Sequence, residues 1–537
     1  MDRVFYNGRI LTMRFKSAAE EEQHRPEAVL VRDGVIAALG SLDEIRKAAG
    51  PDADFLDFDG KCLMPGFIDP HSHFIMNGQT SMWADLSDCN SFAEIIDVLK
   101  DFRKQAGDPE AVIGFGYDHN FLKEGRHPDK RVLDQVSTEI PVFVIHVSVH
   151  FACGNSAVLK LAGIDGNTPD PEGGRYGRLA GSREPDGYLE ETAMNPVFER
   201  FSRTSADLTP EQIAKMQETY LRFGVTTAQD GATSPEEMAA LHRLVQADAL
   251  KLDVVAYPMM SDHGEETLRR YRAYADGYRN HVKIGGYKLI LDGSPQGRSA
   301  WMSEPYLGGD PDYCAYPWMT DGQVERFLET ALREKRQVLA HCNGDAASEQ
   351  FITAYEKTVA KSGIKEDLRP VMIHCQTVRN DQLDRMKKLN MIASIFVGHV
   401  WYWGDIHLMN FGPARGNRIS PVGDALKRGL HVNFHQDTPV TRPDVMHSVW
   451  CAVNRISRRG RVIGKEQKIS VYDALRAVTA QGAYEYFEED SKGTIDVGKR
   501  ADLVILERSP LDVPPAEIRN IKVVQTIKDG ETVYQRP

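Results

Sequence analysis

The stretch "LMPGFIDPHSHF", residues 63–74, decides the fold that we predict, because an apolar run in it leads to two histidines one residue apart. We expect residues 63–69 to form a strand that ends beside these histidines. Side chains two positions apart on an extended chain point the same way, so His71 and His73 can face one point. The chain holds 17 histidines among 537 residues, so such a pair also arises by chance. The pair therefore indicates a metal site only if further ligands join it.

Seven further β-rich runs follow the first, and stretches with helical character separate them. These runs cover residues 225–230, 252–258, 283–291, 337–342, 370–375, 391–396 and 431–437. After Asp321, apolar residues recur with the spacing of a helix face, at Val324, Phe327, Leu328, Ala331 and Leu332. Eight alternations of strand and helix predict an α/β fold with a (β/α)8 TIM-like barrel.

The gap between the first and second predicted strands is too long for a single crossover. Residues from about 76 to 222 carry helix-start signals of their own, a strand-like run at 141–147 and a Gly/Pro-rich loop at 167–187. We therefore expect a large insertion after the first barrel strand. Loops that follow barrel strands surround the active site, so this insertion should cover the substrate.

Both ends of the chain are β-rich. Asn7-Gly8, Asp33-Gly34 and Asp529-Gly530 each lie between apolar runs, and such dipeptides suit the two-residue turns of β-hairpins. We expect residues 1–62 and 485–537 to form one composite β-sandwich domain. The barrel domain would then cover residues 63–484.

Composition limits the classes of partner. The formal net charge is −12 and no long Lys/Arg run occurs, which disfavours nucleic acid and anionic membranes as partners. No apolar stretch reaches the ~18 residues that a membrane-spanning helix requires. The N-terminus lacks the apolar core of a signal peptide, and the seven cysteines are scattered and odd in number. These features predict a cytoplasmic protein with reduced thiols.

Three more candidate ligands end predicted strands. His341 ends the fifth, His374 the sixth and Asp437 the eighth. Catalytic residues of (β/α)8 barrels lie at these carboxyl ends of strands. Imidazole nitrogen and carboxylate oxygen are ligands for zinc and similar cations. Together with the first pair, these residues predict a metal centre, whereas strand alternation turns Cys342 and Cys375 away from it.

Lys288 lies in the fourth predicted strand, between the two groups of histidines. One interpretation is a buried ion pair, with Asp292 as the partner. The other is a lysine carbamate formed with carbon dioxide, whose two oxygens could bridge two cations. The residues alone leave both interpretations open.

Several segments resemble the metal-dependent amidohydrolase superfamily, and within it the YtcJ-like group that includes N-substituted formamide deformylases. The resemblance runs nearly from end to end. It is carried by "NGRILTM", "GKCLMPGFIDPHSH", "HFACGNSAVL" (150–159), "YKLILDGSPQGRSAWMSEPY" (287–306), "AHCNGDAA", "VMIHCQ" and "KGTIDVGKRADLVIL" (492–506).

Carried over residue by residue, the resemblance implies a two-metal site with six ligands. These six predicted ligands are His71, His73, Lys288, His341, His374 and Asp437. The first two histidines would bind one metal, the other two the second, and the carbamylated lysine would bridge them. Two Zn²⁺ ions are expected, although manganese, iron and cobalt tolerate such ligands. Asp437 would be the acid that moves the proton.

The predicted activity is hydrolysis of an amide-like, non-peptide C–N bond in a small molecule. A cation lowers the pKa of its bound water to about 7, so hydroxide could attack a carbonyl at neutral pH while Asp437 shuttles the proton. A deaminase or isomerase could use the same ligands. A single-metal hydrolase would follow if Lys288 were unmodified, and a non-catalytic metal-binding protein is the alternative of a different class. A homodimer is the family-level expectation.

Other residues have a functional and a structural interpretation. His150 and Arg298 are candidate substrate contacts, or else a buried structural histidine and an ordinary salt bridge. His435 and Gln436 stand before Asp437, where the resembled family has small residues. His435 could line the pocket, bond to a ligand or be a core residue. The aromatic and acidic residues that could shape the pocket, or only pack, are Tyr117, Asp118 and Trp401–Trp403.

Overall fold

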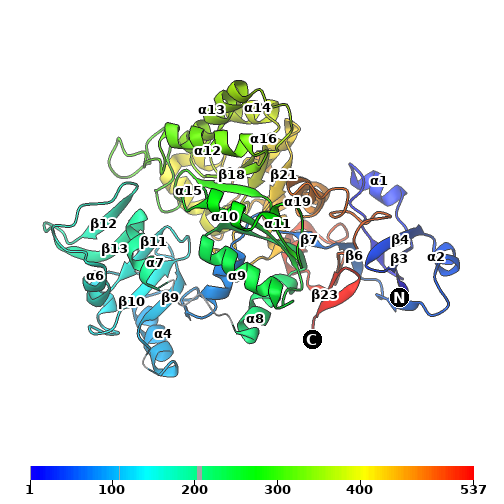
Figure 1. Cartoon of the computed structure of the whole chain (residues 1–537), viewed down its shortest axis with the longest axis horizontal. Helices are drawn as coiled ribbons and strands as arrows, with labels where there is room; N and C mark the ends of the chain where they lie inside the picture. The colour runs from blue at the N-terminus through cyan, green and yellow to red at the C-terminus, as the bar shows by residue number, and fades with distance from the viewer. Residues whose placement is uncertain (1, 108, 202–208) are drawn as a thin grey trace.

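A computed structural model describes residues 2–107, 109–201 and 209–537, and two of its sheets are wholly parallel (Figure 1). The first contains, in spatial order, β16 (Val282–Ile284), β15 (Asp253–Pro258), β14 (Val225–Thr233) and β7 (Phe67–Ile68). The second contains β17 (Gly286–Ile290), β18 (Gln337–Cys342), β19 (Val371–His374), β20 (Ile392–Ile395) and β21 (Val432–Phe434). Every predicted run therefore contains a strand, in the order of the chain.

Backbone hydrogen bonds join the two parallel sheets at both junctions. At one, the N–H of Met260 donates to the carbonyl of Lys288 at 3.0 Å. At the other, the N–H of Asp437 donates to the carbonyl of His71 at 3.3 Å, and that of His73 to Thr438 at 2.8 Å. The ends of the first and eighth predicted strands are thus neighbours.

Two predicted strands are divided in the structure. Residues 63–69 split into β6 (Cys62–Pro65), which pairs with a strand from the C-terminal end, and β7. Residues 283–291 split at Gly285, where the chain passes so close to Tyr257 that an added Cβ would lie 2.4 Å from its ring. Apolar patterning predicts a buried run but not where that run changes its partner.

The helices between the parallel strands begin where the sequence indicates. The predicted helix after Thr320 is α12 (Asp321–Arg333), and its first turn is closed by a capping box with Gln323. Its buried side chains include Val324, Leu328 and Ala331, as the spacing predicted. The longest of the other helices around the second sheet are α13 (Asp345–Ser362) and α15 (His399–Gly416).

Strands from both ends of the chain pair in one sheet, next to each other in Figure 1. Its order is β2 (Arg9–Ile10), β6, β22 (Leu503–Leu506), β23 (Val523–Lys528) and β24 (Glu531–Gln535). A second sheet contains β4 (Val35–Gly40), β3 (Ala28–Arg32), β1 (Asp2–Tyr6) and β5 (Asp54–Asp57). Apolar side chains of both sheets, such as Val31 and Ile505, share one hydrophobic cluster.

Two of the three predicted hairpins are confirmed. Asp33-Gly34 joins β3 to β4 and Asp529-Gly530 joins β23 to β24, and all four residues have positive φ. The hairpin at Asn7-Gly8 is wrong, because β1 and β2 belong to different sheets. Asn7 does have a positive φ of 62°, but the turn carries the chain from one sheet to the other.

The insertion forms a lobe of its own, on the opposite side of the parallel sheets from the chain ends (Figure 1). Its mixed sheet contains β12 (Gly174–Arg178), β13 (Pro185–Glu191), β11 (Phe151–Gly154), β10 (Val142–His146), β9 (Val112–Tyr117) and β8 (Ala84–Asp85). Helices α4 (Phe92–Gln105) and α6 (Ser156–Ala162) pack with it. Within the described part of the chain, no helix is both long and apolar enough to span a bilayer.

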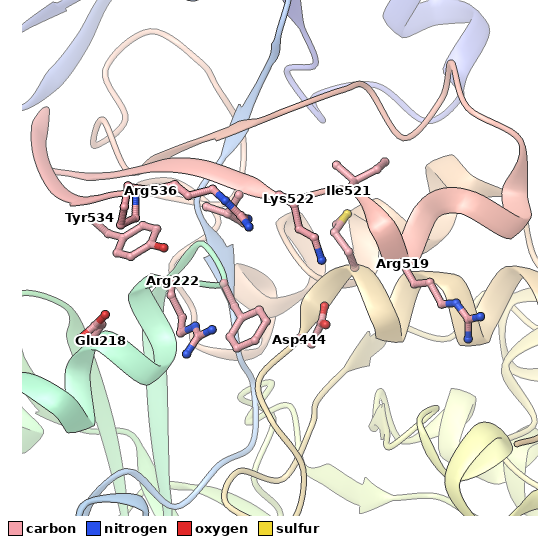
Figure 2. A pocket seen from close by; sticks show the side chains of 12 residues that line it. Glu218, Arg222, Asp444, Arg519, Ile521, Lys522, Tyr534 and Arg536 are labelled. Carbon is pink, nitrogen blue, oxygen red and sulfur yellow. The ribbon is translucent and has the colours of Figure 1, made fainter.

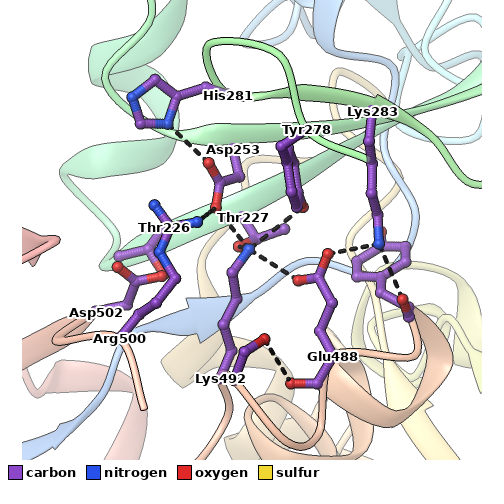
Figure 3. A network of polar contacts seen from close by, with 12 residues as sticks. Thr226, Thr227, Asp253, Tyr278, His281, Lys283, Glu488, Lys492, Arg500 and Asp502 are labelled. Atoms are coloured by element: carbon purple, nitrogen blue, oxygen red, sulfur yellow. Dashed lines mark hydrogen bonds and ion pairs between the residues drawn. The ribbon is translucent and has the colours of Figure 1, made fainter. Parts of the chain in front are cut away.

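A buried ionic network connects the C-terminal segment to the first parallel sheet (Figure 3). The carboxylate of Asp253, at the start of β15, lies 2.5 Å from Nζ of Lys492 and 2.8 Å from Nζ of Lys528. Glu488 also pairs with Lys492, and Asp502 with Lys528. The terminal sheet is therefore attached to the parallel strands by charge as well as by apolar packing.

Candidate metal centre

The first two histidines lie beyond the end of a strand rather than on it. His71 follows β7 by three residues, and His73 directly precedes α3 (Phe74–Thr80). Their rings still converge, with Nε2 of His71 3.4 Å and Nε2 of His73 3.3 Å from Oδ1 of Asp437. The prediction that they face one point is correct, although a loop and not an extended strand directs them.

The other predicted ligands come from three neighbouring strands. Nζ of Lys288, on β17, lies 3.1 Å from Nε2 of His71. Nδ1 of His341, on β18, lies 3.0 Å from Nε2 of His374, the last residue of β19. The rings of His374 and His71 are 5.6 Å apart between centroids. The structure thus brings the six predicted ligands together at the carboxyl ends of the parallel strands.

Hydrogen bonds determine which nitrogen of His71 is available to bind a metal ion. The side-chain amide of Gln229 donates through Nε2 to the carbonyl of Pro70 at 2.5 Å. Oε1 of Gln229 therefore faces Nδ1 of His71, at 2.6 Å, and accepts its hydrogen. Nε2 of His71 is left with a lone pair directed at Lys288 and Asp437.

Burial sets the protonation of the centre. Burial lowers the pKa of His71, His341 and His374 well below the ordinary value, so these imidazoles are neutral. Burial also lowers the pKa of the Lys288 amine to about 7. For Asp437, burial favours the neutral acid, but the neighbouring imidazole of His73 outweighs it and holds the pKa well below its usual range.

The chemistry of these donors fits a divalent cation. Neutral imidazole nitrogens and an ionised carboxylate are the donor set that zinc prefers. Oδ1 of Asp437 is buried and has no hydrogen-bond partner among the described residues, although two imidazole nitrogens lie within 3.4 Å of it. A buried carboxylate oxygen without a donor is costly unless a cation balances it.

A second cluster of potential ligands makes hydrogen bonds within the insertion and to Trp403. Asp118, His119 and His146 in the insertion bring three donor atoms together, with Nδ1 of His119 3.2 Å from Nε2 of His146. However, the N–H of Ser148 donates to Nδ1 of His146, so its hydrogen is on Nε2. Asp118 also accepts from the indole of Trp403 at 2.8 Å. These contacts support the packing interpretation of Asp118 and Trp403.

The alternative ion pair between Lys288 and Asp292 is wrong. The Asp292 carboxylate accepts hydrogen bonds from the backbone N–H groups of Trp301, Asn343 and Gly344, at 2.7–3.0 Å. The nearest polar partner of the Lys288 amine is His71. Lys288 therefore lies in the centre without a carboxylate that is dedicated to it.

The two predicted substrate contacts differ in position. His150, from the insertion, lies 5.4 Å from His341 between ring centroids, and its Nδ1 is 2.8 Å from the buried carboxylate of Glu191. The insertion therefore reaches the centre. Arg298 donates to Asn410 at 2.9 Å and to the carbonyl of Gly308 at 2.6 Å, contacts that hold a loop. Roles in substrate binding stay predictions for both.

One cleft of the described part of the chain lies elsewhere. It has a volume of about 470 Å³ and lies where the ends of α8 (Pro210–Leu221) and α17 (Val445–Asn454) approach β23 and β24 (Figure 2). The described residues that line it include none of the six predicted ligands. Its charged residues are Glu218, Arg222, Asp444, Arg519, Lys522 and Arg536. The sequence did not single out this region.

The comparison with known families agrees with the geometry. Residues 54–534 match the amidohydrolase family over most of the chain. The chain belongs to the amidohydrolase family. This confirms the family that the quoted segments predicted.

Relatives of this amidohydrolase match it over nearly their whole length. The protein YtcJ of Bacillus subtilis is 26% identical over the full length of both chains. The N-substituted formamide deformylase of Arthrobacter pascens is 27% identical, with 95% of each chain covered. The crystal structure of an uncharacterized metal-dependent hydrolase from Pyrococcus horikoshii is 25% identical, with a TM-score of 0.74 over 96% of this chain and 99% of that one.

Sequence reasoning missed two polar residues that lie behind the histidines of the site. Gln229 on β14 and Ser394 on β20 are fully buried, and each contacts an imidazole of the centre or its neighbour. A signal was present for Ser394, which is the single polar residue of β20, whereas Thr226, Thr227 and Asp230 accompany Gln229 on β14 of the amidohydrolase.

Proposed function

We propose that this amidohydrolase is a metal-dependent hydrolase that cleaves an amide-like C–N bond in a small molecule. The carrying observation is that His71 and His73 lie within 3.4 Å of a buried Asp437 oxygen that has no hydrogen-bond partner among the described residues. Lys288, His341 and His374 lie next to this group. The metal-dependent hydrolase and the formamide deformylase among its relatives support the assignment. The parallel strands in chain order, bonded at both junctions, support a (β/α)8 barrel with a composite β-sandwich.

Two groups of side chains would hold the cations. His71 and His73 would bind one, His341 and His374 the other, with Lys288 between them. Zinc suits these ligands, and manganese, iron or cobalt would also be accommodated. When bound, such cations supply a water acidified towards neutral pH and a Lewis acid for the substrate carbonyl.

Asp437 would move the proton. Its carboxylate is ionised, and Oδ1 can accept a proton from the attacking water and then donate it to the departing nitrogen. A neutral leaving amine is far better than an amide anion, so this transfer is what allows the C–N bond to break.

Lys288 would carry the bridging carbamate. With its pKa at about 7, a substantial fraction of the amine is neutral near pH 7 and can add to carbon dioxide. The new N–C bond forms, one proton is released, and the side chain becomes an anion with two oxygens. The change replaces a buried amine by the negative charge that two cations require.

Conversion of Asp437 to Asn tests the assignment. We expect the variant to lose 10²- to 10⁴-fold in turnover of N-formyl or N-acyl amines, about the contribution of a general acid–base, while zinc remains bound. Turnover is followed by release of the carboxylate and amine products. An Asn variant as active as the wild type would refute the role of Asp437, and release of ammonia alone would indicate a deaminase instead.

A further inference from the structure

A chain of buried side chains leads away from the second pair of histidines. Nε2 of His435 lies 3.1 Å from Nδ1 of His374, and Nδ1 of His435 lies 3.0 Å from the hydroxyl oxygen of Ser394. His435 and Ser394 are fully buried, and His374 nearly so. None of the roles proposed above uses Ser394 or His435.

The two nitrogens through which His341 and His374 face each other limit the rest of the chain. Nδ1 of His341 lies 3.0 Å from Nε2 of His374. Nε2 of His341 lies 3.3 Å from the carbonyl oxygen of Gly293, which can accept its hydrogen, and 3.0 Å from the side-chain amide nitrogen of Asn343. If both nitrogens are to bind one cation, the hydrogen of His374 must be on its Nδ1.

The position of the hydrogen on His374 determines where His435 and Ser394 carry their hydrogens. The Nδ1–H of His374 would donate to Nε2 of His435, whose own hydrogen would then be on Nδ1 and would donate to the hydroxyl of Ser394. A hydroxyl can accept or donate, so the same chain can also run in the opposite direction. In that direction Nε2 of His374 carries a hydrogen and cannot bind a cation.

We propose that Ser394 and His435 are positioning residues that select the metal-binding tautomer of His374 and so set the zinc affinity of the His341–His374 position. This inference rests on the proposed metal centre. Groups that bond to the distal nitrogen of a histidine ligand orient its ring, and their loss typically weakens metal binding 10- to 100-fold. His435 thereby has a function beyond filling the core.

The test compares variants that remove one contact each. Ser394→Ala removes the hydroxyl, His435→Phe removes both ring nitrogens, and His435→Gln keeps an oxygen that can accept from His374. Ser448→Ala is the matched control, because Ser448 is an equally buried serine that bonds to Gln436 and not to this chain. Zinc affinity is measured at fixed pH by competition with a chromogenic chelator on the full-length protein, and cobalt spectra report the ligand environment.

We expect Ser394→Ala and His435→Phe to bind the zinc ion at the His341–His374 position 10- to 100-fold less tightly than the wild type, with an altered cobalt spectrum. His435→Gln should lose less, and Ser448→Ala should match the wild type. Melting temperatures of the metal-free proteins show whether a variant is folded. If the His435→Phe variant does not fold, the Ser394→Ala variant still tests the inference, since it removes only one oxygen atom.

Unchanged zinc affinity and cobalt spectrum in Ser394→Ala, or equal losses in Ser448→Ala, would overturn the inference. Failure of the proposed function gives a different result, namely a wild-type protein that binds no zinc. A wild type that binds zinc tightly alongside variants that do so equally well would overturn only the role of Ser394 and His435.

Discussion

Replacement of Asp253 by Asn should destabilise the protein more than any exposed charge change. Asp253 is fully buried and contacts His281 at 2.7 Å as well as Lys492 and Lys528 (Figure 3). Both lysine side chains are only 2% exposed. Asparagine keeps the shape of the side chain and removes its charge, so Lys492 and Lys528 each lose one anionic partner.

The magnitude follows from the contacts that remain. Removal of one partner from a buried ion pair costs about 3–5 kcal/mol. Lys492 keeps Glu488 at 2.8 Å and Lys528 keeps Asp502 at 2.9 Å, so we expect the lower end, about 3 kcal/mol. Typical unfolding free energies are about 5–15 kcal/mol, so this loss is a large share of the total.

Urea unfolding is the appropriate assay because urea is uncharged and does not screen the network. The double variant Asp253→Asn, Lys528→Met removes one charge of each sign and should recover part of the loss. The matched control is Glu329→Gln, which breaks an ion pair to Lys361 in which both side chains are well exposed and should cost less than about 1 kcal/mol. If Asp253→Asn costs no more than Glu329→Gln, the network does not stabilise the fold as reasoned.

Two further predictions concern the lysine and a turn. Zinc and bicarbonate should reactivate metal-free, carbon-dioxide-stripped protein faster as the pH rises through about 7, because only the neutral Lys288 amine reacts with carbon dioxide. The Lys288→Met variant should show no effect of bicarbonate. A wild-type protein whose reactivation does not depend on bicarbonate would contradict the carbamate. Gly34→Ala should lower stability by about 1–2 kcal/mol or more, since its φ is +77° and the new Cβ would lie 3.0 Å from the carbonyl oxygen of Asp529. The control is Gly363→Ala, because Gly363 has a φ of +66° and no atom lies near its added Cβ, so this variant measures the cost of the backbone conformation alone. Both variants are compared by thermal unfolding. Equal losses of stability would show that the contact with Asp529 contributes nothing.

The turns show what local sequence can and cannot predict. Asp33-Gly34 and Asn7-Gly8 have the same local chemistry, and both aspartate and asparagine there adopt positive φ. Only the first makes a hairpin, because β4 returns beside β3, whereas β2 finds its partner in β6. The positive φ of the first turn residue is a local property, but the choice of partner strand depends on apolar surfaces that are distant in sequence. The division of residues 63–69 between two sheets was missed for the same reason.

The site was easier to predict at its ligands than at the groups behind them. Position at the carboxyl end of a strand selected His341, His374 and Asp437 without knowledge of any contact. Gln229 and Ser394 are not at strand ends; they lie within strands and contact histidines that follow other strands.

A rule based on burial would have found them. Gln229 in "VTTAQD", Lys288 in "YKLIL" and Ser394 in "MIASIF" are polar residues in strands that are otherwise mostly buried. A buried polar group is costly without a partner, so each must face another polar group inside the parallel sheets. Where candidate ligands lie at the ends of parallel strands, that partner is most readily one of them. Polar residues inside buried strands should therefore be considered together with the strand-end ligands, and in this protein that reasoning leads from Ser394 through His435 to His374.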